Sequence, residues 1–195
     1  MKLVLATFNR DKARELLALL GVPGLELVSL ADFPGASSPE ETGATLLENA
    51  TLKAEAARRR TGLPAIADDT GLEVEALGGA PGVHAARFAG PGATYADNVR
   101  LLLERMKGVP FERRTARFRT VCVAAFPDGA RLEAEGTVEG RITESPRGTQ
   151  GFGYDPVFEV PELGRTFAEL SIAEKNAISH RGRAARALAQ RLRGR

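Results

Sequence analysis

Cysteine, tryptophan and histidine are almost missing from this sequence of 195 residues. The single cysteine, Cys122, excludes an intramolecular disulfide and argues against a cysteine-based zinc site. The two histidines, His84 and His180, argue equally against a histidine-rich metal centre. No apolar run approaches the roughly 20 residues of a membrane span, and the apolar stretch from Leu3 to Ala6 is too short for a signal peptide. We therefore expect a soluble cytoplasmic protein without a membrane partner.

Lysine is scarce too, and the charges are unevenly distributed. Only five of the 27 cationic residues are lysines, so each lysine marks a position where a compact ammonium group is useful. They are Lys2, Lys12, Lys53, Lys107 and Lys175. Residues 175–195 contain seven cations and no acid, which leaves residues 1–174 with 20 cations against 25 acids. This basic end is typical either of a nucleic-acid-binding tail or of an ordinary basic helix.

Helical and extended patterns alternate along the chain, and its length favours a single domain over residues 1–195. We expect strands at Leu3–Ala6, Leu25–Leu30, Ala65–Ala67 and Leu72–Leu77, and a hairpin formed by Ala116–Phe126 and Arg131–Ile142. We expect helices from Asn9 to a stop at Gly21, over Ala44–Arg60, after Thr94, over Ile172–Asn176 and over His180–Leu192. This order predicts an α/β protein with a mixed central sheet flanked by helices and with two lobes around a cleft.

A polar segment follows the first expected strand. It consists of Thr7, Phe8, Asn9, Arg10, Asp11 and Lys12. The beginning of a helix presents free N–H groups and the positive end of the helix dipole, which together suit a phosphate group. Lys12 is unfavourable there unless it binds an anion. The sequence contains no P-loop motif, so the alternative is an ordinary capped helix.

Two pairs of adjacent acids, Glu40-Glu41 and Asp68-Asp69, are the candidate metal ligands. The aspartates follow a short buried strand, which predicts a position at the rim of the sheet. Oxygen ligands without histidine or cysteine suit Mg²⁺, and a remaining carboxylate would act as a general base on water. The alternative for each pair is a solvated acidic turn.

Lys53 lies on or beside the apolar stripe of its expected helix. A lysine in this position either extends outward to solvent or contacts an anion, such as an acid cluster or a phosphate.

The loop Gly148–Pro156 places two aromatic residues among three glycines and ends close to an acid, Asp155. Phe152 or Tyr154 would stack on a planar base, and the glycines allow close approach of the backbone. The alternative is an irregular turn with buried aromatics. Further along, Lys175, His180 and Arg181 would donate to keto or phosphate oxygens, or else form a basic surface. The residues together predict a site for a phosphorylated planar molecule and Mg²⁺.

Seven short motifs then occur in order over nearly the whole chain. They are Leu5-Ala6-Thr7-x-Asn9-x-x-Lys12, Glu40-Glu41-Thr42-Gly43, Glu48-Asn49-Ala50-x-x-Lys53-Ala54, Ala67-Asp68-Asp69-Thr70-Gly71-Leu72, Leu77-Gly78-Gly79-Ala80-Pro81-Gly82, Gly151-Phe152-Gly153-Tyr154-Asp155-Pro156 and Ser179-His180-Arg181-Gly182. In this combination the chain resembles the inosine/xanthosine triphosphate pyrophosphatases, a Ham1-like family.

The resemblance implies Mg²⁺-dependent hydrolysis of ITP, dITP and XTP to the monophosphate and pyrophosphate, an elongated two-lobed fold and a homodimer. It makes Asp69 the proton acceptor and a metal ligand, with Lys53 beside it in the catalytic group. Asp68, Glu40 and Glu41 are the other candidate metal ligands, and Glu40 is preferred over Glu41. The implied substrate-binding residues are Thr7, Phe8, Asn9, Arg10, Asp11, Lys12, Thr70, Phe152, Gly153, Tyr154, Asp155, Lys175, His180 and Arg181.

Two other functions remain open from the sequence. One is a non-catalytic nucleotide- or RNA-binding module that uses the arginine-rich end, against which the intact acid pair argues. The other is a pyrophosphatase for different modified nucleotides, such as pyrimidines.

Overall fold

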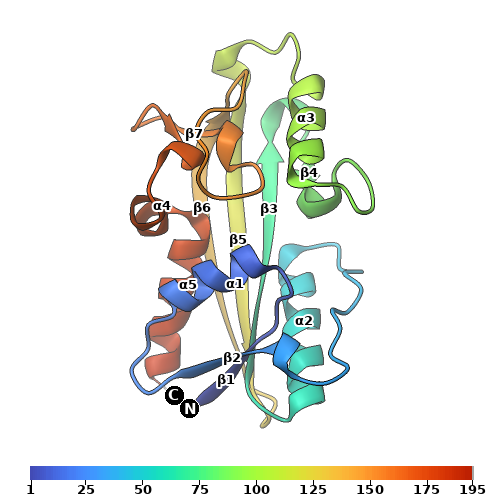
Figure 1. Ribbon diagram of the computed structural model, residues 1–195, viewed down its shortest axis with the longest axis vertical. Coiled ribbons are helices and arrows are strands. Elements are labelled where there is room, and N and C mark those ends of the chain that lie inside the picture. Colours follow the sequence, from blue (N-terminus) through green and yellow to red (C-terminus); the bar gives the residue numbers. More distant parts are fainter. Residues whose placement is uncertain (195) are drawn as a thin grey trace. The chain divides into compact units, whose positions relative to one another are not determined.

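The computed structural model describes residues 1–194 (Figure 1). Within this range the chain forms five α-helices and one eight-stranded sheet. The helices are α1 (Arg10–Leu19), α2 (Leu46–Thr61), α3 (Tyr95–Arg105), α4 (Ile172–Ile178) and α5 (His180–Arg193). The strands are β1 (Lys2–Leu5), β2 (Glu26–Ser29), β3 (Ala65–Val74), β4 (Pro81–Gly82), β5 (Thr115–Ala125), β6 (Arg131–Ile142), β7 (Phe158–Val160) and β8 (Arg165–Thr166). Arg195, the last of the basic residues, lies outside the described range.

The sheet is mixed, as the sequence predicts. Its strands follow the order β2-β1-β3-β5-β6-β7-β8, and β4 pairs with β3 at the side. β1 is parallel to β2 and β3, whereas the pairs β3–β4, β6–β7 and β7–β8 are antiparallel. The expected hairpin is confirmed as β5 and β6, which are neighbours in the sheet. None of the helices among residues 1–194 is both long and apolar enough to cross a membrane.

The chain divides into two compact units, each assembled from separate segments. Unit 1 comprises Met1–Asp69, Thr120–Gly136 and the described residues from His180 onward, and unit 2 comprises Thr70–Arg119 and Thr137–Ser179. The long strands β3, β5 and β6 contribute one half to each unit.

In unit 1, helices cover both faces of the sheet. Leu3 and Leu5 of β1 and Ile66 of β3 belong to a buried cluster with Leu16 of α1 and Leu188 of α5. Residues that alternate with these along the strands point to the other face, where α2 contacts β1. The residues of α2 that are buried there are small, so the helix lies close to the sheet. They include Ala50, Ala54 and Ala57.

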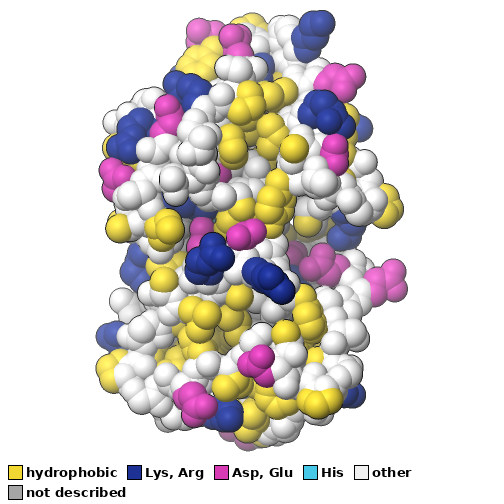
Figure 2. Space-filling view, viewed as in Figure 1, with side chains coloured by type: hydrophobic (Ala, Val, Ile, Leu, Met, Phe, Trp, Pro, Cys, Tyr) yellow, Lys and Arg dark blue, Asp and Glu magenta, His cyan; other side chains and the backbone are white. Residues whose placement is uncertain are grey.

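In unit 2, α3 and three aromatic rings form the core. Val99, Leu102 and Met106 of α3 are buried in one cluster with Phe118, Phe158 and Phe167. The ring of Phe158 lies 4.6 Å from that of Phe118 and 5.1 Å from that of Phe167, between centroids. Figure 2 shows further hydrophobic side chains gathered on the surface of this unit, in the upper part of the view.

Local signals explain where the helices begin and end. The side chains of Thr45 and Glu48 form a reciprocal capping box at the beginning of α2, and Gly62 ends this helix in the left-handed conformation. Asn9 caps α1, as expected, and Thr94 and Ser171 form capping boxes for α3 and α4. The helix α1 ends with Leu20 as its C-cap, so Gly21 occupies the expected position directly after the cap, but it does so without a positive φ.

The expectation of two separate strands, Ala65–Ala67 and Leu72–Leu77, is wrong. The segment is one continuous strand, β3, from Ala65 to Val74. Gly71 has no positive φ, so the chain stays extended there, and the second half of the strand pairs with β4. Pairing with neighbouring strands therefore overrides the turn-forming tendency of Asp, Thr and Gly. Pairing with β1 extends to Ile66, so Asp68 and Asp69 still lie just beyond the carboxyl end of β1.

Gly136 of β6 permits a close approach of α5. A Cβ atom at this position would lie 2.1 Å from the carbonyl oxygen of His180 and 2.5 Å from the amide nitrogen of Ala184. We expect Gly136→Ala to lower the free energy of unfolding by about 3 kcal/mol or more, because backbone atoms cannot rotate away. Urea denaturation measures this loss. The control is Gly21→Ala, where no atom lies within 4 Å and the change stays within about 1 kcal/mol. Equal stability of the two variants would contradict the close packing.

Candidate active site

Two adjacent carboxylates of β3, Asp68 and Asp69, organise a charged cluster within unit 1. Both are nearly inaccessible, with 2% and 4% of their surface exposed. Because neighbouring residues of a strand point to opposite faces, Asp68 lies on the face covered by α1 and α5, and Asp69 lies on the face covered by α2. The structure therefore does not bring the two predicted metal ligands to one point.

Asp68 contacts cations from two helices. Its Oδ2 accepts a hydrogen bond from Nε of Arg181 at 3.1 Å and lies 3.7 Å from Nζ of Lys12. The other end of the Arg181 guanidinium donates to Oε2 of Glu15 at 2.5 Å. Asp68 and Glu15 thus hold Arg181 between α1 and the first turn of α5, and the guanidinium is buried.

Asp69 contacts residues of α2 instead. Nζ of Lys53 lies 2.8 Å from Oδ1 of Asp69 and 3.0 Å from Oε1 of Glu41. Nδ2 of Asn49, one turn before Lys53 on the same helix, donates to Oδ2 of Asp69 at 3.4 Å. Lys53 therefore does not extend to solvent but joins the two carboxylates, one from β3 and one from the loop before α2.

The two aspartates differ in acidity. Burial alone would raise the pKa of Asp68, but Lys12, Arg181 and Lys53 outweigh this effect and hold that pKa well below its usual range. Burial raises the pKa of Asp69, and Lys53 and Lys12 offset this only in part. Asp68 is consequently a permanent counter-charge, whereas Asp69 has the greater affinity for a proton.

The beginning of α1 is less open to an anion than its sequence suggests. Oδ1 of Asn9 accepts the N–H groups of Asp11 and Lys12, at 3.0 and 3.1 Å, and Thr7 accepts that of Asn9. Phe8 and Arg10 are exposed. The side chain of Lys12 remains as the binding group. Burial lowers its pKa and Asp68 restores it only partly, so a bound phosphate would stabilise the charged ammonium.

The donor set fits Mg²⁺ held mainly by water and substrate. Within residues 1–194, no group of three or more His, Cys, Asp or Glu side chains is arranged to hold a metal ion by itself. Glu41 and Asp69, however, meet at the same ammonium group. Two carboxylates are what Mg²⁺ takes from a protein when phosphates and waters complete its octahedron. Glu40, the acid preferred from the sequence, is exposed, so the geometry favours Glu41.

In unit 2, the predicted base-binding residues form a second group. Nζ of Lys175 lies 2.5 Å from Oδ2 of Asp155, and the same oxygen accepts the N–H of Phe152 at 2.8 Å. The Lys175 ammonium also lies 4.8 Å from the centre of the Phe152 ring. Tyr154 is buried and donates its hydroxyl to the carbonyl oxygen of Ala85, so Phe152 is the aromatic residue that remains partly accessible for stacking. Gly153, beside it, has a positive φ.

The remaining predicted residues lie beside these groups. Thr70 directly follows Asp69 in β3 and is partly exposed. His180 is buried at the beginning of α5, next to Arg181.

Two residues of the cluster were not predicted to act there. Glu15 lies three positions after Lys12, so both lie on the same face of α1. Asn49 lies four positions before Lys53, on the buried face of α2. This helical spacing from a scarce lysine is the signal that would have found them.

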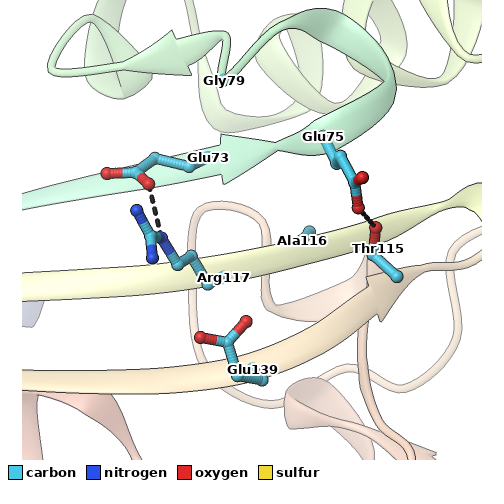
Figure 3. Close-up of a pocket in the computed structure, with 7 residues that line it drawn as sticks. All are labelled: Glu73, Glu75, Gly79, Thr115, Ala116, Arg117 and Glu139. Carbon is cyan, nitrogen blue, oxygen red and sulfur yellow. Dashed lines mark hydrogen bonds and ion pairs between the residues drawn. The ribbon is translucent and has the colours of Figure 1, made fainter.

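A separate pocket of about 300 Å³ lies in unit 2 among β3, β5 and β6 (Figure 3). Its lining consists of Glu73, Glu75, Gly79, Thr115, Ala116, Arg117 and Glu139. Arg117 pairs with Glu73, and Thr115 donates to Glu75. None of the predicted site residues lines this pocket, so we do not regard it as the active site.

Comparison with known proteins gives one consistent result. A model of the Ham1 family matches residues 3–191. A protein of Thermus thermophilus named dITP/XTP pyrophosphatase is 56% identical over 188 residues, which are 96% of this chain and 90% of that one. A Geobacillus kaustophilus protein of the same name is 54% identical over 183 residues, with 94% and 90% covered. The solved structure of a HAM1 protein from Coxiella burnetii superimposes with a TM-score of 0.91 at 42% identity, with both chains fully covered.

We expect Asp68→Asn to destabilise the protein by about 3–5 kcal/mol at pH 7, because it leaves buried cations without their counter-charge. The folded-state pKa of Asp68 is lowered, so its contribution is complete above the ordinary value of about 4 and is lost as the pH falls through the folded-state pKa. The difference between wild type and variant should therefore shrink below about pH 4. Chemical denaturation between pH 3 and 7 measures it. The control is Asp32→Asn, the same change at an exposed position, and a loss equal to that of this control would contradict the assignment.

Proposed function

This chain belongs to the Ham1 family, and we propose that it hydrolyses deaminated purine nucleoside triphosphates (ITP, dITP and XTP) to the monophosphate and pyrophosphate. The observation that supports this most strongly is the contact of Lys53 with both Asp69 and Glu41. This contact joins one ammonium group and two carboxylates, which would supply a cation for phosphate, a proton acceptor and a second metal ligand. Relatives more than 50% identical over nearly their whole length are named dITP/XTP pyrophosphatases, which supports the same reaction.

Asp69 acts as the general base in this proposal. It takes a proton from the attacking water while the anhydride bond between the α- and β-phosphates breaks and pyrophosphate leaves. Burial raises its pKa, which makes it a better proton acceptor than a solvated aspartate. Lys53 and Asn49 bond to its two oxygens and fix the direction in which the carboxylate faces.

Mg²⁺ would be held by Glu41 and Asp69, together with water and substrate phosphates. When bound, it neutralises phosphate charge and polarises a phosphoryl oxygen. Lys53, which contacts both carboxylates, would contribute its positive charge to binding of the phosphates. Lys12 supplies a second cation for the triphosphate from α1.

Recognition of the base rests on hydrogen-bond donors. Hypoxanthine and xanthine have a keto oxygen at position 6, where adenine has an amino group. Lys175, His180 and Arg181 would donate to that oxygen, and adenine would leave them unpaired in the bound state. Phe152 would stack on the ring. A cytoplasmic location, which the sequence composition suggests, and a homodimer, which the resemblance implies, belong to the same proposal.

We expect the purified protein to convert ITP with Mg²⁺ into IMP and pyrophosphate, with ATP at least about 100-fold slower in kcat/KM because its 6-amino group leaves the donors unpaired. GTP, which shares the 6-keto oxygen, should also be slower, through its 2-amino group. Chromatography of the nucleotide product and a pyrophosphate-specific assay measure this. Release of orthophosphate together with IDP would overturn the proposal. A wider panel that includes modified pyrimidine triphosphates separates it from the alternative substrate class.

Asp69→Asn tests the role of the proton acceptor in the same assay. It should lower kcat by about 100-fold or more, because the proton acceptor is lost while the shape of the side chain is kept. Nucleotide binding should persist. Full activity of this variant would remove Asp69 from the mechanism.

The neighbouring acids of the loop provide a test of the metal ligands. We expect Glu41→Gln to raise the Mg²⁺ concentration for half-maximal rate by about tenfold or more, because a ligand charge is lost. Glu40→Gln, the same change one position earlier at an exposed side chain, should leave it unchanged. Titration of activity with Mg²⁺ measures both, and the reverse order would assign the ligand to Glu40.

A further inference from the structure

Tyr95 is the first residue of α3 and contacts the ring of Phe152. The two ring centroids are 5.7 Å apart, and the ring planes are inclined by 39°. Thr94 and Asp97 cap the helix through a reciprocal pair of hydrogen bonds, which fixes the backbone from which Tyr95 projects. Since 42% of Tyr95 is exposed, this contact is not part of the buried core of the unit.

Contacts within the loop fix the backbone of Phe152, whereas the neighbouring residues determine the orientation of the Phe152 ring. Gly151 and Gly153 flank Phe152, both with positive φ. Asp155 accepts the N–H of Phe152, and a Cβ atom at Gly151 would lie 2.0 Å from the same carboxylate oxygen. These contacts fix the main chain. The ring direction depends on the residues around it, which include Lys175 and Tyr95.

A cavity beside this contact gives the Phe152 ring space to turn. It has a volume of about 530 Å³ and lies between α3 and the loop of Phe152. Tyr95, Val99 and Leu103 line it from the helix, and Pro146, Phe152 and Pro156 line it from the loop. It lies in the part of the molecule where Figure 2 shows hydrophobic side chains at the surface. The helix and the loop are therefore not closely packed here, and the ring of Tyr95 bridges them.

We propose that Tyr95 is a positioning residue for base recognition, which holds the Phe152 ring in the orientation needed for stacking on the substrate. This inference rests on the proposed function, because it concerns the step in which the base binds. Without the Tyr95 ring, one of the contacts that orient Phe152 is lost and the ring has space to turn toward the cavity; base binding then requires it to return. Tyr95 itself touches no reacting atom, so the cost falls on substrate binding and not on bond cleavage.

The test is steady-state kinetics with ITP for wild type, Tyr95→Ala and Tyr95→Phe. We expect Tyr95→Ala to raise KM for ITP about three- to tenfold, the range that corresponds to loss of one aromatic pair, with kcat changed less than about twofold. Tyr95→Phe should restore the wild-type KM, because the ring contact does not use the hydroxyl group. The melting temperature of each variant shows whether the fold is intact.

Leu163→Ala provides the matched control, since Leu163 is similarly exposed in unit 2 and lies outside the proposed site. Its KM should equal that of wild type. An unchanged KM in Tyr95→Ala, a loss of kcat alone, or a Tyr95→Phe variant that behaves like Tyr95→Ala would each overturn the inference. If the wild type fails to release pyrophosphate from ITP, the proposed function itself is overturned; an active wild type beside an unaffected Tyr95→Ala overturns only the role of Tyr95.

Discussion

Consecutive residues of a β-strand point to opposite faces of the sheet, and in β3 this rule separates Asp68 from Asp69. Two carboxylates that would repel each other in a turn are instead divided between two helical layers. Asp68 contacts cations from α1 and α5, whereas Asp69 contacts residues of α2. The continuity of β3 through this point is thus a condition for the site, because a turn at residues 68–71 would not impose the separation.

The separation assigns different tasks to the two acids. Asp68 stays ionised and neutralises the buried Arg181 and the half-buried Lys12 beside the sheet. Asp69 has fewer compensating charges, and its raised pKa suits a group that must take up a proton. The same dipeptide therefore provides a permanent counter-charge and, in the proposed reaction, the proton acceptor. The environment of each carboxylate, and not its residue type, decides which it is.

Local structure was largely predictable because its signals lie close together in the sequence. Asn9, the pair Thr45 and Glu48, and Gly62 each act within a few residues of the helix end that they define. The continuous β3 was not predictable in this way, since its pairing with β4 and with the other strands overrides the local preference of Thr70 and Gly71.

The residues of the candidate site likewise divide into those with a local signal in the sequence and those without one. Lys12 and Lys53 stood out because lysine is rare in the chain. The preference for Glu40 over Glu41 could not be decided, because adjacent loop residues differ only in the direction in which they face. Contacts over long separations, such as that of Arg181 with Glu15, have no local signal.

The ion pair between Asp68 and Arg181 also affects how the chain folds while it is being synthesised. Arg181 follows Asp68 by 113 positions, which a ribosome adding about 5–20 residues per second needs roughly 6–23 s to translate. During that interval β1 and the first half of β3 lack the apolar residues of α5 that later cover them, among them Leu188 and Leu192. Until α5 emerges, this sheet face therefore has the cover of α1 but not that of α5, and Asp68 has the contact with Lys12 but not that with Arg181. Unit 1 and its candidate site are complete only after α5 has been made.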